Sequence, residues 1–161
     1  MTEVGRILDQ YDRAMSGEAW HGDNVWSILE AIEWVDAFER PLAERHTIWE
    51  LVAHMKFWET EVRKRLEGVA ALPDEKLNFL AMPEASPENW KRALLEFRDS
   101  NNSFRAVVAA LNDARLEQPL SAPNKSVYVE VHGVIQHNLY HAGQIALLRK
   151  NSANDKVPAG L

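Results

Sequence analysis

A stretch near the end of the sequence, HNLYHAGQIALLRK (residues 137–150), combines the pattern of a packed helix with two histidines. In an α-helix, positions i, i+4 and i+7 lie almost above one another, so His137, His141 and Gln144 project from one face. Two histidines at this spacing are a common pair of metal ligands. Such a pair also occurs as structural or surface residues, so the spacing leaves both interpretations open.

The same face of this helix mixes apolar and polar side chains. At 100° per residue, one narrow arc holds Glu130, Val134, His137, His141, Gln144 and Leu148. If this arc faces the protein core, its polar groups need hydrogen-bond partners or a bound ligand, because burying them alone costs free energy.

The rest of the chain also has helical periodicity, with no strand pattern and no repeat. Thr47 and Glu50 form a capping box for a helix that ends near Gly68, and Ser86-Pro87 begins another that reaches about residue 113. The remaining helices are predicted over residues 2–16, from about 23 or 24 through Ile32, and over 126–150. These elements predict an all-α protein, a four-helix bundle with a short extra helix after the first helix. We expect one domain over residues 1–150 and a flexible tail over 151–161.

Composition excludes several classes of function. The 161 residues carry a net charge of −6 at a pI near 5.5, so the general positive charge of a nucleic-acid-binding protein is absent. There is no cysteine, which removes disulfides, thiolate ligands and cysteine nucleophiles. No signal peptide and no apolar run long enough to cross a membrane is visible, so we expect a cytoplasmic protein with no membrane partner.

A catalytic metal site needs a third protein ligand besides the pair. Of the other histidines, His132 lies about 140° from His137 on the same helix and cannot converge with it. His21 and His46 lie in a turn and at a helix end. His54 lies within a helix, at the edge of its apolar stripe, where it is either a ligand that reaches a neighbouring helix or a core-edge histidine bonded to a carbonyl.

Two segments together resemble a known family: HTIWELVAHMKFWE (residues 46–59) and, about eighty residues later, VHGVIQHNLYHAGQIALLRK (131–150). They are similar to the DinB/YfiT-like superfamily of metalloenzymes, and AWHGDNVWSILEAI (19–32) and RPLAERHTIWEL (40–51) fit the same subgroup. The resemblance implies a four-helix bundle whose divalent metal is held by three histidines, here His54, His137 and His141. Asn138 departs from the family, which often has aspartate there.

The resemblance also implies the kind of chemistry. We expect Zn²⁺ or Ni²⁺ and a small-molecule substrate, in a transferase that uses a low-molecular-weight thiol or in a hydrolase. The alternative is a non-catalytic bundle that binds a metal or small ligand. Many members of the family form homodimers, so a homodimer is expected here.

Several further residues are candidates for the site. Gln144 is expected to hydrogen-bond an imidazole N–H, and Glu130 either orients a ligand, takes a proton or simply favours the start of its helix. Trp58 and Trp20 are the tryptophans expected near the pocket. Gly133 and Gly143 weaken the last helix, which predicts close approach of another helix.

Overall fold

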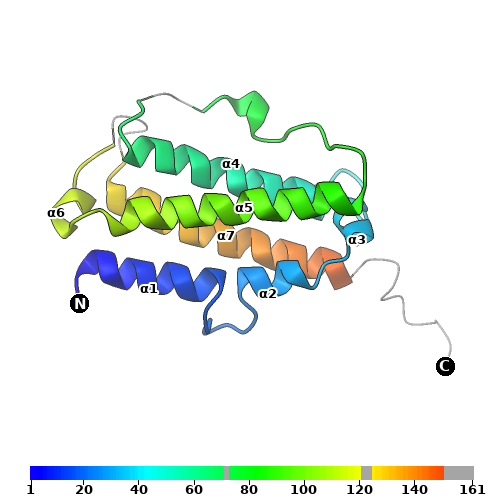
Figure 1. The fold of residues 1–161 in the computed structure, drawn as a ribbon, viewed down its shortest axis with the longest axis horizontal. Helices are drawn as coiled ribbons and strands as arrows, with labels where there is room; N and C mark the ends of the chain where they lie inside the picture. Colours follow the sequence, from blue (N-terminus) through cyan, green and yellow to red (C-terminus); the bar gives the residue numbers. More distant parts are fainter. Residues whose placement is uncertain (71–72, 121–124, 151–161) are drawn as a thin grey trace.

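The structure, a computed structural model, describes residues 1–70, 73–120 and 125–150. Within these residues there are seven α-helices, one short 3₁₀ helix and no β-strand (Figure 1). The all-α prediction is confirmed. The predicted tail, residues 151–161, lies outside the described residues. None of the described helices combines the length and the apolar character that a membrane crossing requires.

The long helices begin at the residues that the sequence indicates. Helix α1 (Glu3–Met15) is capped by Thr2, whose hydroxyl accepts a hydrogen bond from the Gly5 N–H. Helix α4 (Ile48–Leu66) begins with the predicted capping box of Thr47 and Glu50, in which each side chain accepts from the other's N–H. Ser86 caps α5 (Pro87–Ala109) by accepting a hydrogen bond from the Asn89 N–H, and α7 spans Val127–Lys150.

Two boundaries differ from the prediction. The predicted extra helix after α1 is α2 (Val25–Glu30), and a further short helix that was not predicted, α3 (Trp34–Phe38), follows after a turn at Ala31. Helix α5 ends at Ala109, and a separate turn of helix, α6 (Asp113–Leu116), follows. The side chain of Asn112 caps α6 by accepting a hydrogen bond from the Arg115 N–H. The residues just after Asn112 are therefore helical, but they belong to a second helix and not to α5.

Helix α4 packs against both α5 and α7 on one side of the bundle, and α1 packs against the same two helices on the other side, with α2 against α7 (Figure 1). Apolar side chains from every long helix fill the space between them, including Ile7, Met55, Phe97, Phe104, Val131 and Ile145. This packing sets α4 against α7 along much of their length, and α4 and α7 carry the three predicted ligand histidines.

A buried carboxyl group joins four helices inside this core. Glu59 of α4 accepts hydrogen bonds from the Tyr11 hydroxyl of α1 (2.7 Å) and the Asn101 amide of α5 (2.7 Å). The Asn138 amide of α7 lies 3.4 Å from the same carboxyl group. Burial raises the pKa of Glu59, whose side chain has no cationic partner among its hydrogen bonds. Asn138 therefore faces the core, beside the metal-ligand candidates and not among them.

Candidate metal centre

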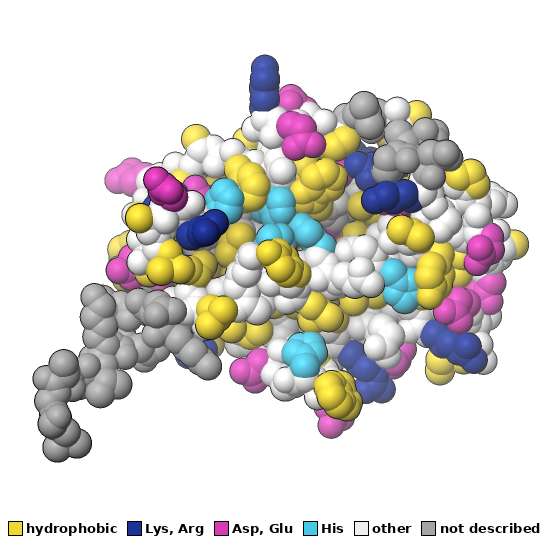
Figure 2. Space-filling view, turned by 180° about the vertical axis from the view of Figure 1, so that it is seen from behind, with side chains coloured by type: hydrophobic (Ala, Val, Ile, Leu, Met, Phe, Trp, Pro, Cys, Tyr) yellow, Lys and Arg dark blue, Asp and Glu magenta, His cyan; other side chains and the backbone are white. Residues whose placement is uncertain are grey.

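Three histidines from two helices converge at one point. His54 projects from the middle of α4, and His137 and His141 project one turn apart from α7. The Nε2 atom of His137 lies 3.0 Å from the Nε2 of His54 and 3.1 Å from the Nε2 of His141. One ligand atom from each lies within 4.8 Å of those of the other two. Figure 2 shows histidine side chains gathered on one face of the molecule, bordered by hydrophobic side chains.

The outer nitrogens of two of these rings have fixed partners. The Nδ1 of His54 lies 2.6 Å from the side-chain oxygen of Asn78, and the Nδ1 of His141 lies 2.7 Å from that of Gln144. An amide oxygen only accepts hydrogen bonds, so each Nδ1 carries the proton. The Nε2 atoms of His54 and His141 are then unprotonated, and their lone pairs point toward the shared centre.

This arrangement fits a bound cation. Two unprotonated nitrogens face His137 Nε2, which carries at most one proton and so can donate well to only one of them. A divalent ion at the centre satisfies all three lone pairs at once, and three imidazoles are an established donor set for zinc. The nitrogen separations of 3.0 and 3.1 Å are close to those of neighbouring ligands around one small ion.

The three imidazoles are neutral near pH 7. Burial, followed by the charge of neighbouring His141, lowers the pKa of both His54 and His137 from 6.5 to about 4. Burial also lowers the pKa of His141, although its bond to Gln144 opposes the shift. Neutral rings are the form that binds metal, so protons do not compete for this centre at neutral pH.

Asn78 and its neighbour Phe79 belong to the connection between α4 and α5, which the sequence does not mark as part of a site. The Phe79 ring stacks on His54 with centroids 4.4 Å apart, and His46 stacks on the other face of Phe79 at 3.9 Å. This connection therefore both orients His54 and covers it. Asn78 follows the 3₁₀ turn Glu75–Leu77, and a polar residue in a long loop carries no pattern that would single it out.

A cleft of about 530 Å³ opens beside His137. Trp58 and Val62 of α4 line it together with Val134 of α7. The edge of the Trp58 ring also lies against His54, with centroids 6.5 Å apart. The predicted Trp58 is thus placed next to both the histidines and an open space large enough for a small molecule.

Glu130 lies at the far part of this cleft, buried, and it binds Arg65 rather than a histidine. The Arg65 Nη1 donates to Glu130 Oε2 at 2.7 Å, and both side chains are more than nine-tenths buried. Because this carboxylate is engaged by Arg65 and bonds to no histidine in the described part of the chain, its position weighs against Glu130 as a base at the metal centre. Glu130 also lies in the first turn of α7, which fits the alternative that its negative charge stabilises the N-terminal end of the helix dipole.

The prediction for the two helical glycines is wrong. A Cβ built on Gly133 or Gly143 meets no atom within 4 Å, so no other helix approaches them closely. Gly133 lines the cleft beside His137, and Gly143 lines a separate cavity. The absent side chain at Gly133 leaves the cleft wider next to the histidines.

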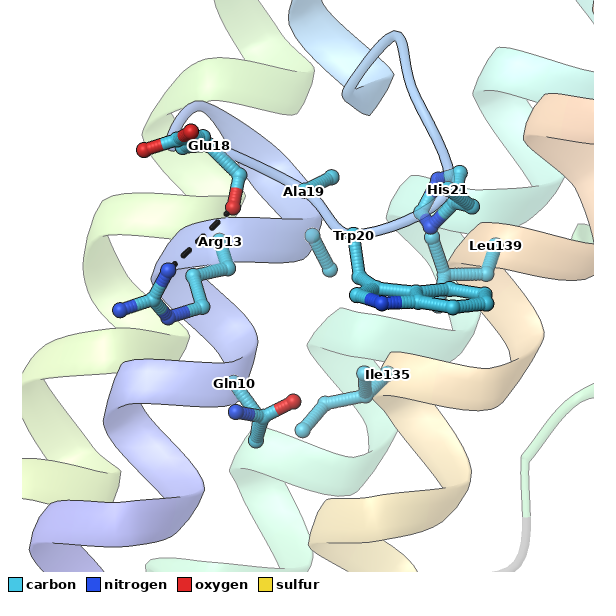
Figure 3. A pocket seen from close by; sticks show the side chains of 9 residues that line it. Gln10, Arg13, Glu18, Ala19, Trp20, His21, Ile135 and Leu139 are labelled. Atoms are coloured by element: carbon cyan, nitrogen blue, oxygen red, sulfur yellow. Dashed lines mark hydrogen bonds between the residues drawn. The ribbon is translucent and has the colours of Figure 1, made fainter.

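Trp20 lies away from the histidines and is fully exposed. It stands in the loop between α1 and α2 and lines a cavity of about 700 Å³ with His21, Ile135 and Leu139 (Figure 3). Leu139 lies two residues from each of His137 and His141, which places it on the opposite side of α7. The loop therefore carries Trp20 and His21 to the wrong face of α7 for a role at the metal centre.

The remaining histidines also stay outside the cluster. His132 lies against Tyr128 on the same helix, with centroids 4.3 Å apart and the rings tilted by 48°, as expected for a residue on another face of α7. His46 reaches the site only through Phe79 and lies 3.6 Å from Glu50.

Comparison with protein families matches residues 19–145 to the DinB superfamily. Comparison with curated proteins finds no match. Comparison with solved structures finds no match either.

Proposed function

Because the chain belongs to the DinB superfamily, we propose that it is a divalent-metal-dependent enzyme that acts on a small molecule, with His54, His137 and His141 as its metal ligands. The observation that carries this proposal is the pair of contacts from the Nδ1 atoms of His54 and His141 to the amide oxygens of Asn78 and Gln144, which leave two Nε2 lone pairs directed toward His137. Three neutral imidazoles suit Zn²⁺ or Ni²⁺ and leave positions for other ligands. When bound, such an ion supplies Lewis acidity that acidifies a water or a thiol.

The nucleophile comes from a small molecule. The chain has no cysteine, and the nearby carboxylate Glu130 is bound to Arg65. A thiol or a water that enters the cleft beside His137 is therefore the best candidate. We favour a transferase that uses a low-molecular-weight thiol, since the cleft has room for more than water. In that reaction sulfur bonds to an electrophilic carbon, the leaving group departs with the electron pair of the broken bond, and the thiol proton passes to solvent.

The residues of the chain have distinct tasks in this proposal. Asn78 and Gln144 hold the tautomers of His54 and His141, so that both rings present Nε2 to the ion. Phe79 covers His54 and keeps water from that side of the ring. Trp58 forms the wall along which the substrate approaches His137.

Cobalt substitution tests this function. With Co²⁺ in place of the native ion, adding a small thiol such as mercaptoethanol should produce a sulfur-to-cobalt charge-transfer band. The His141→Ala protein should show no such band, because it lacks a complete ligand set. If the Co²⁺ protein binds no thiol but hydrolyses activated esters, the protein is a hydrolase and not a thiol transferase. If it does neither, the chain is a non-catalytic metal-binding bundle. A homodimer and a cytoplasmic location stay predictions.

A further inference from the structure

We propose that the cleft beside His137 recognises a carboxylate at the far end of the substrate, through the buried guanidinium of Arg65. This inference rests on the proposed function, because it takes the metal centre as the reacting end of the same cleft. It assigns Arg65 a role that the three histidines do not imply.

The cleft joins the two ends physically. His137 and Glu130 both line it, and they stand seven residues apart on α7. At the helical rise per residue this separation is about 10 Å. Arg65 lies at the Glu130 end, where its Nη1 donates to that carboxylate. A ligand that reaches from the histidines to Arg65 therefore needs a chain of several atoms between its reacting group and its acid.

Arg65 has hydrogen-bonding capacity that the protein leaves unused. A guanidinium carries five N–H donors, and the described residues engage Arg65 through Nη1 alone. Its Nε is buried without any hydrogen-bond partner. The Trp58 ring, 5.9 Å from the guanidinium carbon, limits where the group can move. A buried donor without a partner costs free energy, so a ligand that accepts a hydrogen bond from this guanidinium offsets part of that cost. Because the guanidinium is already held in place, little further entropy is lost when the ligand binds to it.

The charges around the cleft favour an anion once the metal is present. The lining includes two cations, Arg65 and Lys125, and two anions, Glu75 and Glu130, which balance one another. A divalent ion on three neutral imidazoles adds positive charge that nothing in this lining offsets. Apolar walls from Trp58, Val62 and Val134 lie between the ends. The chemical class that fits is a small molecule with an apolar linker and a terminal carboxylate.

Two measurements report separately on ligand binding at the two ends of the cleft. In the Co²⁺ protein, the charge-transfer band reports thiol binding at the histidines. In the Zn²⁺ protein, the NMR signal of the Arg65 Nε–H, assigned by its loss in a variant, reports events at the guanidinium. The probes are mercaptohexanoate, mercaptohexanol of equal length, and the shorter mercaptopropionate. Mercaptohexanoate should bind about tenfold more tightly than mercaptohexanol and shift the Arg65 signal. Mercaptopropionate should give the band without the shift.

Two double variants keep the net charge of the protein. Arg65→Met/Glu130→Met removes both partners, so neither charge is left buried alone, and it should abolish the preference for mercaptohexanoate. Arg63→Met/Glu67→Met is the matched control, because this neighbouring ion pair at the C-terminal end of α4, 2.8 Å apart, does not line the cleft. The control should keep the preference. Glu130→Gln, which frees the guanidinium, should increase it.

The outcomes distinguish this inference from the proposed function. A band for every thiol with no preference and no Arg65 shift overturns the inference and leaves the metal chemistry intact. An Arg65 shift without any band supports carboxylate recognition and contradicts thiol binding at the metal. A preference that survives in Arg65→Met/Glu130→Met also overturns the role of Arg65.

Discussion

The Nε2 atoms of His54 and His137 lie 3.0 Å apart, although the two residues are 83 positions apart in the chain. Their approach depends on the packing of α4 against α7 and on the hydrogen bond that orients the His54 ring. His54 is held by Asn78 from a loop, whereas His141 on α7 is held by Gln144 of the same helix. The site therefore depends on the loop after α4 as much as on the helices.

Replacing Asn78 should weaken metal binding without unfolding the bundle. In Asn78→Ala the His54 Nδ1 loses its acceptor, and the ring no longer has a fixed tautomer. Loss of such a partner typically lowers metal affinity 10- to 100-fold, so we expect about tenfold weaker binding in a competition with a chelator. Asn78→Asp keeps an acceptor and should bind metal at least as well as the wild type. Equal affinity in Asn78→Ala would show that the loop does not position His54.

The metal-free protein should lose stability in acid partly through its histidines. The pKa of His137 falls from 6.5 to about 4 on folding, so between these values the unfolded chain binds more protons than the folded one. The stability that His137 contributes is present above pH 6.5 and is lost as the pH falls toward 4. We expect the difference in unfolding free energy between the wild type and His137→Asn to shrink over this range, measured by denaturant titration. A constant difference would contradict the burial of a neutral ring.

Glu59 should have the opposite dependence on pH. Burial raises its pKa above 4.5, so the folded protein binds the extra proton and the group's contribution is greatest at low pH. This contribution is lost as the pH rises through the folded pKa. Glu59→Gln keeps a neutral group of the same shape, so the stability of the wild type relative to this variant should fall with rising pH above 4.5. A difference that rises with pH would mean that the carboxylate is ionised and well stabilised in the core.

Gly133 offers a test of the cleft itself. A Cβ there meets no atom within 4 Å, so Gly133→Ala should raise the unfolding free energy by about 0.5–1 kcal/mol through helix propensity. Gly133→Leu should fill space beside His137 and weaken the binding of mercaptohexanoate to the Co²⁺ protein. Gly143→Leu is the matched control, since Gly143 lies on the same helix and lines a different cavity. Equal loss in both variants would mean that the cleft does not receive the ligand.

The helices and two of the three candidate ligand histidines were predictable because each leaves a local trace in the sequence. Thr47 with Glu50, and Ser86 with Pro87, mark helix starts by hydrogen bonds within four residues. His137 and His141 share one face of one helix, which the helical repeat alone determines. His54 needed the family resemblance, because its spacing alone left two interpretations open.

The features that the sequence did not predict depend on tertiary contacts. Asn78 and Phe79 reach His54 only because their loop folds back over α4. The partner of Glu130 is Arg65, on an adjacent helix, and no local pattern connects the two. Trp20 was misplaced because the sequence does not show which side of α7 its loop meets.

The proposed metal centre requires that His54, His137 and His141 together hold one divalent ion. Elemental analysis tests this requirement most directly, on protein made without a histidine tag, loaded with Zn²⁺ and freed of loosely bound ions. We expect about one ion per chain in the wild type. We expect near-background metal in His54→Ala and His137→Ala, with helical circular dichroism retained because apolar packing holds the bundle. A wild type without metal, or variants with as much metal as the wild type, would contradict the proposed centre.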